Sequence, residues 1–305
     1  MHSYSRKEFL FTTALLLGGA ASFGKLPFGK KPPKLAFSTL GCPDWPLEKI
    51  TGFAREHGYT GIEVRGIQRE LDLTKSPYFN SPAAISATLD RMKANGLQFV
   101  GLGSSSTLHF ADPLKRQQQL DDGRRFIDLA AKLNCPYVRV FPNNFPKDQE
   151  KEQTMDLITR GLLELADHAK GSKVTVLMET HGDLVYKADL LRIMKAAEHR
   201  HTGLVWDLTN MWSITREAPA EVYKDLKPYI RHTHIKDAKL KDGKLEYCLL
   251  GKGDIPIMEA ISLLAKDNYK GFYSFEWEKL WHPEIAEPEI AFADFPKVMK
   301  AHLDQ

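Results

Sequence analysis

The chain has 305 residues, of which 43% are hydrophobic and 27% charged, so it can form one α/β barrel of about 250 residues or two smaller domains. No apolar stretch approaches the roughly 20 residues of a membrane span. Six of the 42 basic residues and one of the 39 acidic residues lie at positions 1–34, which leaves 36 basic and 38 acidic residues, a near-neutral balance that argues against binding to nucleic-acid phosphates.

The amino-terminal segment has the pattern of an export signal. Arg6 and Lys7 precede the apolar run Phe9–Leu17, and small residues follow it, as is typical of a signal peptide. We expect a signal peptide at residues 1–24, a basic linker rich in proline and glycine at 25–33, and a folded domain at 34–305. The protein would be exported to the periplasm, with no stable insertion in the membrane after processing. Residues 5–10 resemble the twin-arginine export motif with Lys7 in place of the second arginine, so that route and general secretion both stay open.

From residue 34 onward, short apolar runs alternate with longer amphipathic ones. The short runs are dense in Val, Ile, Phe, Tyr and Leu without clean alternation, which is typical of strands covered on both faces. We expect eight strands, at Lys34–Leu40, Gly61–Arg65, Gln98–Gly103, Tyr137–Phe141, Val174–Glu179, Gly203–Asp207, Ile230–Ile235 and Phe272–Trp277.

The segments between the strands have helical patterns. Pro82–Asn95 begins with a proline after Ser81 and ends before Gly96, the usual asymmetry of helix ends. The other expected helices are Leu47–His57, Leu114–Leu133, Glu150–Lys170, Lys187–His199, Ala220–Leu226, Ile255–Asp267 and Ile290–Leu303. Strict strand–helix alternation predicts a parallel sheet, and closure into a single-domain (β/α)8 TIM barrel satisfies both sheet edges. The alternative is an open doubly wound sheet, which the lack of a glycine-rich loop after the first strand disfavours.

Barrel enzymes carry their active sites at the carboxyl ends of the strands, where four successive strands of this chain have polar groups that can bind metals. These groups are Glu179, Asp207, His234 and Glu276. Carboxylates gathered near a barrel axis repel one another and lose solvation, and a divalent cation removes both penalties. Three carboxylates and one imidazole suit one Mn²⁺, Mg²⁺ or Co²⁺ ion, with Zn²⁺ as a further option. Of His232 and His234, only one need be a ligand.

Four segments of the chain resemble those of a known family. Ser38-Thr39-Leu40-Gly41-Cys42, Gly61-Ile62-Glu63-Val64-Arg65, His234-Ile235-Lys236-Asp237 and Leu250-Gly251-Lys252-Gly253-Asp254 are similar, in order and spacing, to segments of the sugar phosphate isomerase/epimerase family of xylose isomerase-like TIM barrels. The resemblance covers the chain from about residue 34 to its end. It implies that Glu179, Asp207, His234 and Glu276 bind the metal, and that Glu179 and Glu276 are the catalytic acid–base pair.

The resemblance also implies substrate contacts, with one departure from the family. His181 and Lys236 would face the substrate. Asn210 stands where many members have a histidine, so a contact of the epimerase type there is in doubt. Trp45 and Trp277 could form the walls of a sugar pocket, or they could simply pack in the barrel. Glu63 either contacts the substrate or pairs with Arg65.

We therefore expect a metal-dependent isomerase, epimerase or lyase that enolises a sugar or keto-sugar next to its carbonyl. For an exported protein, a 3-keto-glycoside is the substrate we expect. Epimerisation, isomerisation and elimination share the enolising step, and the sequence leaves the choice and the oligomeric state open. Two rival interpretations are a phosphodiester hydrolase of the endonuclease IV type and a non-catalytic carbohydrate-binding barrel. The near-neutral composition and Asn210 disfavour the hydrolase, because the endonuclease IV branch needs extra histidines. The presence of all four expected ligands disfavours the binding barrel.

Overall fold

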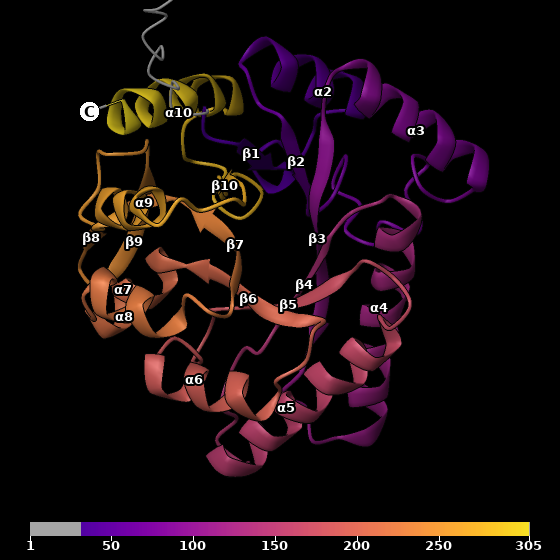
Figure 1. Ribbon diagram of the computed structural model, residues 1–305, viewed down its shortest axis with the longest axis vertical. Coiled ribbons are helices and arrows are strands. Elements are labelled where there is room, and N and C mark those ends of the chain that lie inside the picture. Colours follow the sequence, from indigo (N-terminus) through magenta and orange to yellow (C-terminus); the bar gives the residue numbers. More distant parts are fainter. Residues whose placement is uncertain (1–31, 305) are drawn as a thin grey trace, which may run out of the picture. The chain divides into compact units, whose positions relative to one another are not determined.

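A computed structural model describes residues 32–304 of the chain. Eight parallel strands form a closed barrel in the order β1-β10-β7-β6-β5-β4-β3-β2 (Figure 1). Their bounds are β1 Leu35–Ser38, β2 Gly61–Val64, β3 Gln98–Thr107, β4 Tyr137–Phe141, β5 Thr175–Glu179, β6 Thr202–Asp207, β7 Ile230–Ile235 and β10 Tyr273–Phe275. The predicted TIM barrel is confirmed and the open sheet is excluded, because β1 pairs with both β2 and β10. The predicted signal peptide and most of the predicted linker lie outside the described residues.

Helices cover the outside of the barrel (Figure 1). They are α2 Leu47–Glu56, α3 Pro82–Ala94, α4 Pro113–Lys132, α5 Lys151–His168, α6 Lys187–Ala196, α7 Leu208–Thr215, α8 Pro219–Leu226, α9 Ile257–Lys266 and α10 Pro288–Leu303. The expected start of α3 is present, because the Ser81 side chain accepts a hydrogen bond from Ala84 N with Pro82 in the first turn. None of the helices in residues 32–304 is long and apolar enough to cross a membrane.

The seam where the barrel closes is held by aromatic packing. Phe37 of β1 stacks on Phe292 of α10 with ring centroids 4.1 Å apart, and Phe275 of β10 stacks on Phe295 at 4.6 Å. All four rings are buried. Helix α10 therefore buries apolar surface against both closing strands, and this burial stabilises the parallel pairing of β1 with β10.

Two elements differ from the sequence prediction. Helix α7 begins directly after β6, and its amino end is capped by Asp207, whose side chain accepts from Asn210 N. A hairpin, β8 Asp237–Lys241 and β9 Lys244–Cys248, follows β7. Its turn at Asp242 and Gly243 has positive φ at both residues, the backbone conformation that an Asp-Gly pair adopts in a two-residue hairpin. Both elements lie at the carboxyl end of the barrel, beside the residues expected to bind metal.

Candidate metal centre

The four predicted ligands lie together at the carboxyl end of four adjacent strands. Glu179 and Asp207 are the last residues of β5 and β6, His234 lies in β7, and Glu276 follows β10. The strand register places Asp207 beside His234. His234 Nδ1 lies 3.2 Å from Glu179 Oε1, 3.2 Å from Glu276 Oε1 and 3.8 Å from Asp207 Oδ2. All four donor atoms fall within 4.8 Å of one another, which is close enough for them to share one ion.

Burial and charge make these carboxylates mutually dependent. Desolvation, with the charges of Glu276 and Glu179 nearby, raises the pKa of Asp207 to about 7 against the lowering effect of Lys236. Desolvation also opposes ionisation of Glu179 and Glu276, but His234 and a basic partner, Arg139 or Lys236, hold the pKa of each below its usual value. The two glutamates are therefore ionised at neutral pH, as a base or a metal ligand must be.

The buried groups around the site carry more negative than positive charge, and a divalent cation would balance the difference. Three permanent cations face five carboxylates: Arg65, Arg139 and Lys236 against Glu63, Glu179, Asp207, Glu276 and Glu278. When all five carboxylates are ionised and the imidazoles are neutral, which is the state that metal binding requires, two negative charges remain. Asp207 Oδ2 and Glu179 Oε2 are buried and accept no hydrogen bond of regular geometry from the described residues. Their ion-pair partners are Lys236 Nζ at 2.8 Å and Arg139 Nε at 3.1 Å. Oxygen-rich donors with two uncompensated charges are the environment that hard divalent cations bind.

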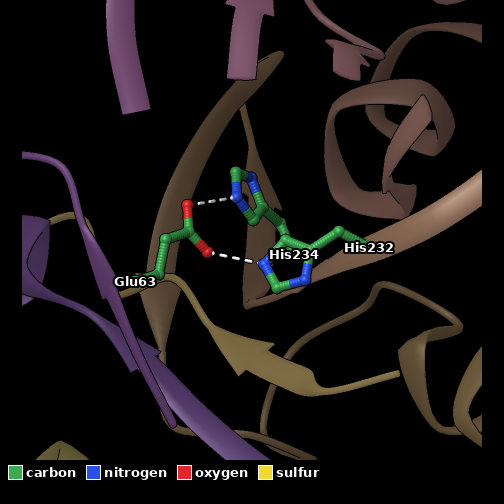
Figure 2. Close-up of side chains that lie close together, drawn as sticks. All are labelled: Glu63, His232 and His234. Carbon is green, nitrogen blue, oxygen red and sulfur yellow. Dashed lines mark hydrogen bonds and ion pairs between the residues drawn. The ribbon is translucent and has the colours of Figure 1, made fainter. Parts of the chain in front are cut away.

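Glu63 faces the rings of His232 and His234, with one carboxylate oxygen directed at each (Figure 2). Its Oε1 lies 2.8 Å from His234 Nε2, and its Oε2 lies 2.8 Å from His232 Nε2. Ser274 Oγ donates to the same Oε2 at 2.7 Å. A carboxylate on Nε2 fixes the proton there and leaves Nδ1 free to bind metal. In the structure Glu63 pairs with the two histidines, in place of the alternative pairing with Arg65. This placement suits a residue that positions His234, and the predicted substrate contact stays a prediction.

Replacing Glu63 by glutamine should weaken metal binding while leaving the fold intact. Glutamine has one acceptor oxygen for two histidines and carries no charge, so His234 loses its fixed tautomer. Residues in contact with metal ligands typically contribute about 10–100-fold to metal affinity, and we expect a loss in that range. Titration of metal-free protein with Mn²⁺ or Zn²⁺ by calorimetry measures it, with a thermal melt as the folding control. An unchanged Kd in a folded variant would contradict this role.

Two arginines that the sequence analysis did not select lie beside Glu179. Arg139 of β4 is buried, and its Nε lies 3.1 Å from Glu179 Oε2. Arg65 donates to Ser105 Oγ and Gly103 O, and burial, with the charge of Arg139, lowers its pKa to about 10. A side chain at Gly103 would meet both, 2.9 Å from Arg65 Cδ and 3.0 Å from Arg139 Nη2. The isolated arginine in the apolar strand Tyr137–Phe141 was the available sequence signal.

Among the predicted substrate contacts, His181, Asn210 and Lys236 are at the site. Asn210 Nδ2 lies 3.5 Å from Glu179 Oε1. His181 is half-buried, pairs with Asn143 Oδ1 at 3.0 Å, and has a pKa lowered by burial despite the nearby charge of Glu179. Lys236 is buried and forms ion pairs with Asp207, Glu276 and Glu278. Glu278 shares the side of the strand end that carries Glu276, so strand alternation could have identified it.

The two predicted tryptophans are packed in the interior. Trp277 is 1% exposed, donates through Nε1 to Ala286 O and stacks on Phe275, so a substrate contact would require it to leave this packing. Trp45 lines a cavity of about 600 Å³ that contains none of the four predicted ligands. Packing, the alternative interpretation of the sequence, is what the structure shows for Trp277.

Comparison with known proteins agrees with this architecture. A family model described as xylose isomerase-like TIM barrel matches residues 52–295. An inosose dehydratase of Clostridium botulinum (strain Eklund 17B / Type B) is 26% identical over 159 residues, which are 47% of this chain and 52% of that protein. The chain spans about half the length of the curated relatives it matches.

Two solved structures illustrate the similarity of fold. The IOLI protein, solved with a bound zinc atom, has a TM-score of 0.74 at 18% identity, with 89% of this chain and all of that chain covered. The 3-keto-D-glucoside 4-epimerase YcjR from E. coli has a TM-score of 0.71 at 16% identity, with 88% and 99% covered. At these identities the likeness concerns the fold.

Proposed function

Because this chain belongs to the xylose isomerase-like TIM barrel family, we propose that it is a metal-dependent enzyme that enolises a sugar or keto-sugar beside its carbonyl group. The observation that carries this proposal is the placement of Glu179 and Glu276. They lie at 3.2 Å from the same atom, His234 Nδ1, and come from strands that flank β6 and β7 on either side. Two ionised carboxylates that face one small space can act on the two sides of one carbon atom.

The residues of this chain suggest how the reaction proceeds. Glu179, Asp207, His234 and Glu276 would hold one divalent ion, which supplies the Lewis acidity that stabilises an enediolate. One glutamate takes the proton from the carbon beside the carbonyl. If the other glutamate returns a proton on the opposite side, that carbon is inverted. If a leaving group departs from the neighbouring carbon instead, the outcome is elimination.

The names of similar proteins support a keto-sugar as the substrate class. They include inosose dehydratase and 3-keto-D-glucoside 4-epimerase, one a dehydratase and one an epimerase. Both classes of reaction follow from removal of a proton next to a carbonyl. We favour a 3-keto-glycoside, since an exported enzyme would meet glycosides and would not meet intracellular sugar phosphates.

Exchange of the substrate proton with solvent tests the proposal. Metal-loaded protein in D₂O should introduce deuterium at the carbon beside the carbonyl of a 3-keto-glycoside or ketose, followed by NMR, and chelator-treated protein should not. A shielded base can transfer the same proton internally, so substrate deuterated at that carbon is run in parallel. Conversion with neither an isotope effect nor loss or transfer of that label would exclude enolisation. Cleavage of a model phosphodiester would then point to the hydrolase.

Export is a separate part of the proposal. It is supported by the sequence pattern of Arg6, Lys7 and the apolar run Phe9–Leu17. Mass spectrometry of the protein recovered from the periplasmic fraction of its native host should find a chain that begins near residue 25. Active protein with an intact Met1 in the cytoplasm would overturn it.

A further inference from the structure

Lys236 places a buried ammonium group directly against the predicted metal ligands. His232 and His234 of β7 and Lys236, which directly follows it, are every second residue of the chain, so all three face the interior of the barrel. Lys236 Nζ lies 2.8 Å from Asp207 Oδ2, 2.7 Å from Glu276 Oε2 and 2.6 Å from Glu278 Oε1. The lysine side chain is only 2% exposed. Two of its three partners belong to the predicted ligand set.

The carboxylate groups of Glu276 and Asp207 lie between His234 Nδ1 and the ammonium group of Lys236. Glu276 presents Oε1 to His234 Nδ1 and Oε2 to Lys236 Nζ, so its two oxygens have different partners. Asp207 is more constrained, because its Oδ1 accepts from Asn210 N at the start of α7. Only Asp207 Oδ2 remains, and it lies both 2.8 Å from Lys236 Nζ and 3.8 Å from His234 Nδ1. A metal ion and the ammonium group therefore compete for this oxygen.

We propose that Lys236 is a resident counter-ion of the metal centre: it keeps the ligand carboxylates assembled in the metal-free protein and lowers metal affinity by competing for Asp207 Oδ2. The physical basis is that like charges repel strongly where water is excluded, whereas three buried carboxylates without a counter-ion are destabilising. Repulsion between the ammonium group and the metal weakens metal binding, and so does the stabilisation of the metal-free carboxylates by the ammonium group. Without the ammonium group, the bound state loses a repulsion and the metal-free state loses a stabilising partner.

The test compares variants that remove or keep this charge. Lys236→Met removes the charge and keeps an unbranched side chain. Because a like charge next to the metal is removed, we expect metal to bind about tenfold more tightly or better, whereas loss of a residue that contacts a metal ligand usually weakens metal binding. Lys236→Arg keeps the charge and should stay close to wild type. Lys279→Met is the matched control, because Lys279 is also largely buried but binds Pro283 O, Ile285 O and Glu287 and no metal ligand. Its metal Kd should be unchanged.

Two measurements follow metal directly and do not depend on the sugar reaction. Calorimetric titration with Mn²⁺ gives the Kd, and the rate of metal loss to excess chelator applies even if Lys236→Met folds only with metal. The metal-free Lys236→Met variant should also have a lower Tm than metal-free wild type, and saturating Mn²⁺ should reduce this difference in Tm.

Equal or weaker metal affinity in Lys236→Met, or equal or faster metal loss, would overturn the inference. This inference rests on the metal centre of the proposed function, and the outcomes separate the two. Wild-type protein that binds no divalent ion would overturn the metal centre and the role of Lys236 together. Wild-type protein that binds metal but exchanges no substrate proton would overturn only the proposed reaction.

Discussion

Replacing His234 by alanine should reduce the metal content from about one ion per chain to background and abolish proton exchange. His234 Nδ1 is the atom around which Glu179, Glu276 and Asp207 are arranged, and it is the nitrogen donor of the set. Without it, three carboxylates remain beside Lys236, and the ammonium group can take their oxygens. Elemental analysis of purified protein measures the metal content.

His232→Gln is the matched control for this prediction. His232 is also buried on β7, but its Nε2 pairs with Glu63 and with none of the four predicted ligands. We expect this variant to retain metal, with affinity reduced only through the support that Glu63 gives His234. Equal metal content in His234→Ala and wild type would remove His234 from the ligand set. If His232→Gln lost its metal and His234→Ala kept it, His232 would be the ligand and His234 would not.

Replacing Glu179 or Glu276 by glutamine should strongly reduce proton exchange in protein that still holds metal. A general acid or base typically contributes about 10²–10⁴-fold, and we expect each single variant to lose activity in that range. Burial opposes the charge on both groups, but His234 and their basic partners keep each pKa below its usual value, so the wild-type base is ready at neutral pH. Glutamine keeps the shape of the side chain and one oxygen that can bind the metal, but it lacks the carboxylate that accepts the substrate proton.

Metal occupancy must be measured in the same samples, because each substitution also weakens one metal bond. Glu278→Gln is a useful comparison, since Glu278 is a buried neighbour of Glu276 whose carboxylate pairs with Lys236 and lies outside the ligand set. It should lose less activity than either of the other two variants. Full proton exchange in metal-loaded Glu179→Gln and Glu276→Gln would show that neither group is the base.

Some features of the fold were hidden from sequence reasoning for identifiable reasons. The hairpin of β8 and β9 is mostly polar and half-exposed, so it lacks the apolar run that marked the barrel strands. Its Asp242-Gly243 turn was the available signal. Strand β10 has only three residues. Glu276 follows it, and its backbone N–H still donates a hydrogen bond to Ile235 O of β7.

The barrel, and the grouping of the four predicted ligands at one end of it, could be derived from the order of residues alone. Buried parallel strands are local apolar runs that can be counted, and the carboxyl ends of such strands always meet at one end of a barrel. Glu179, Asp207, His234 and Glu276 could therefore be grouped without knowledge of any distance.

The pairing of charges around these predicted ligands, in contrast, depends on the closed fold. Glu63 reaches His234 across 171 residues of sequence, although Arg65, only two residues away, offered a nearer partner. Lys236 is held by three carboxylates from β6 and the segment after β10, a set of partners that the sequence did not predict. Pairing in a water-excluded interior depends on which charges the closed barrel brings within a few ångströms, and that distance has no counterpart in the order of residues along the chain.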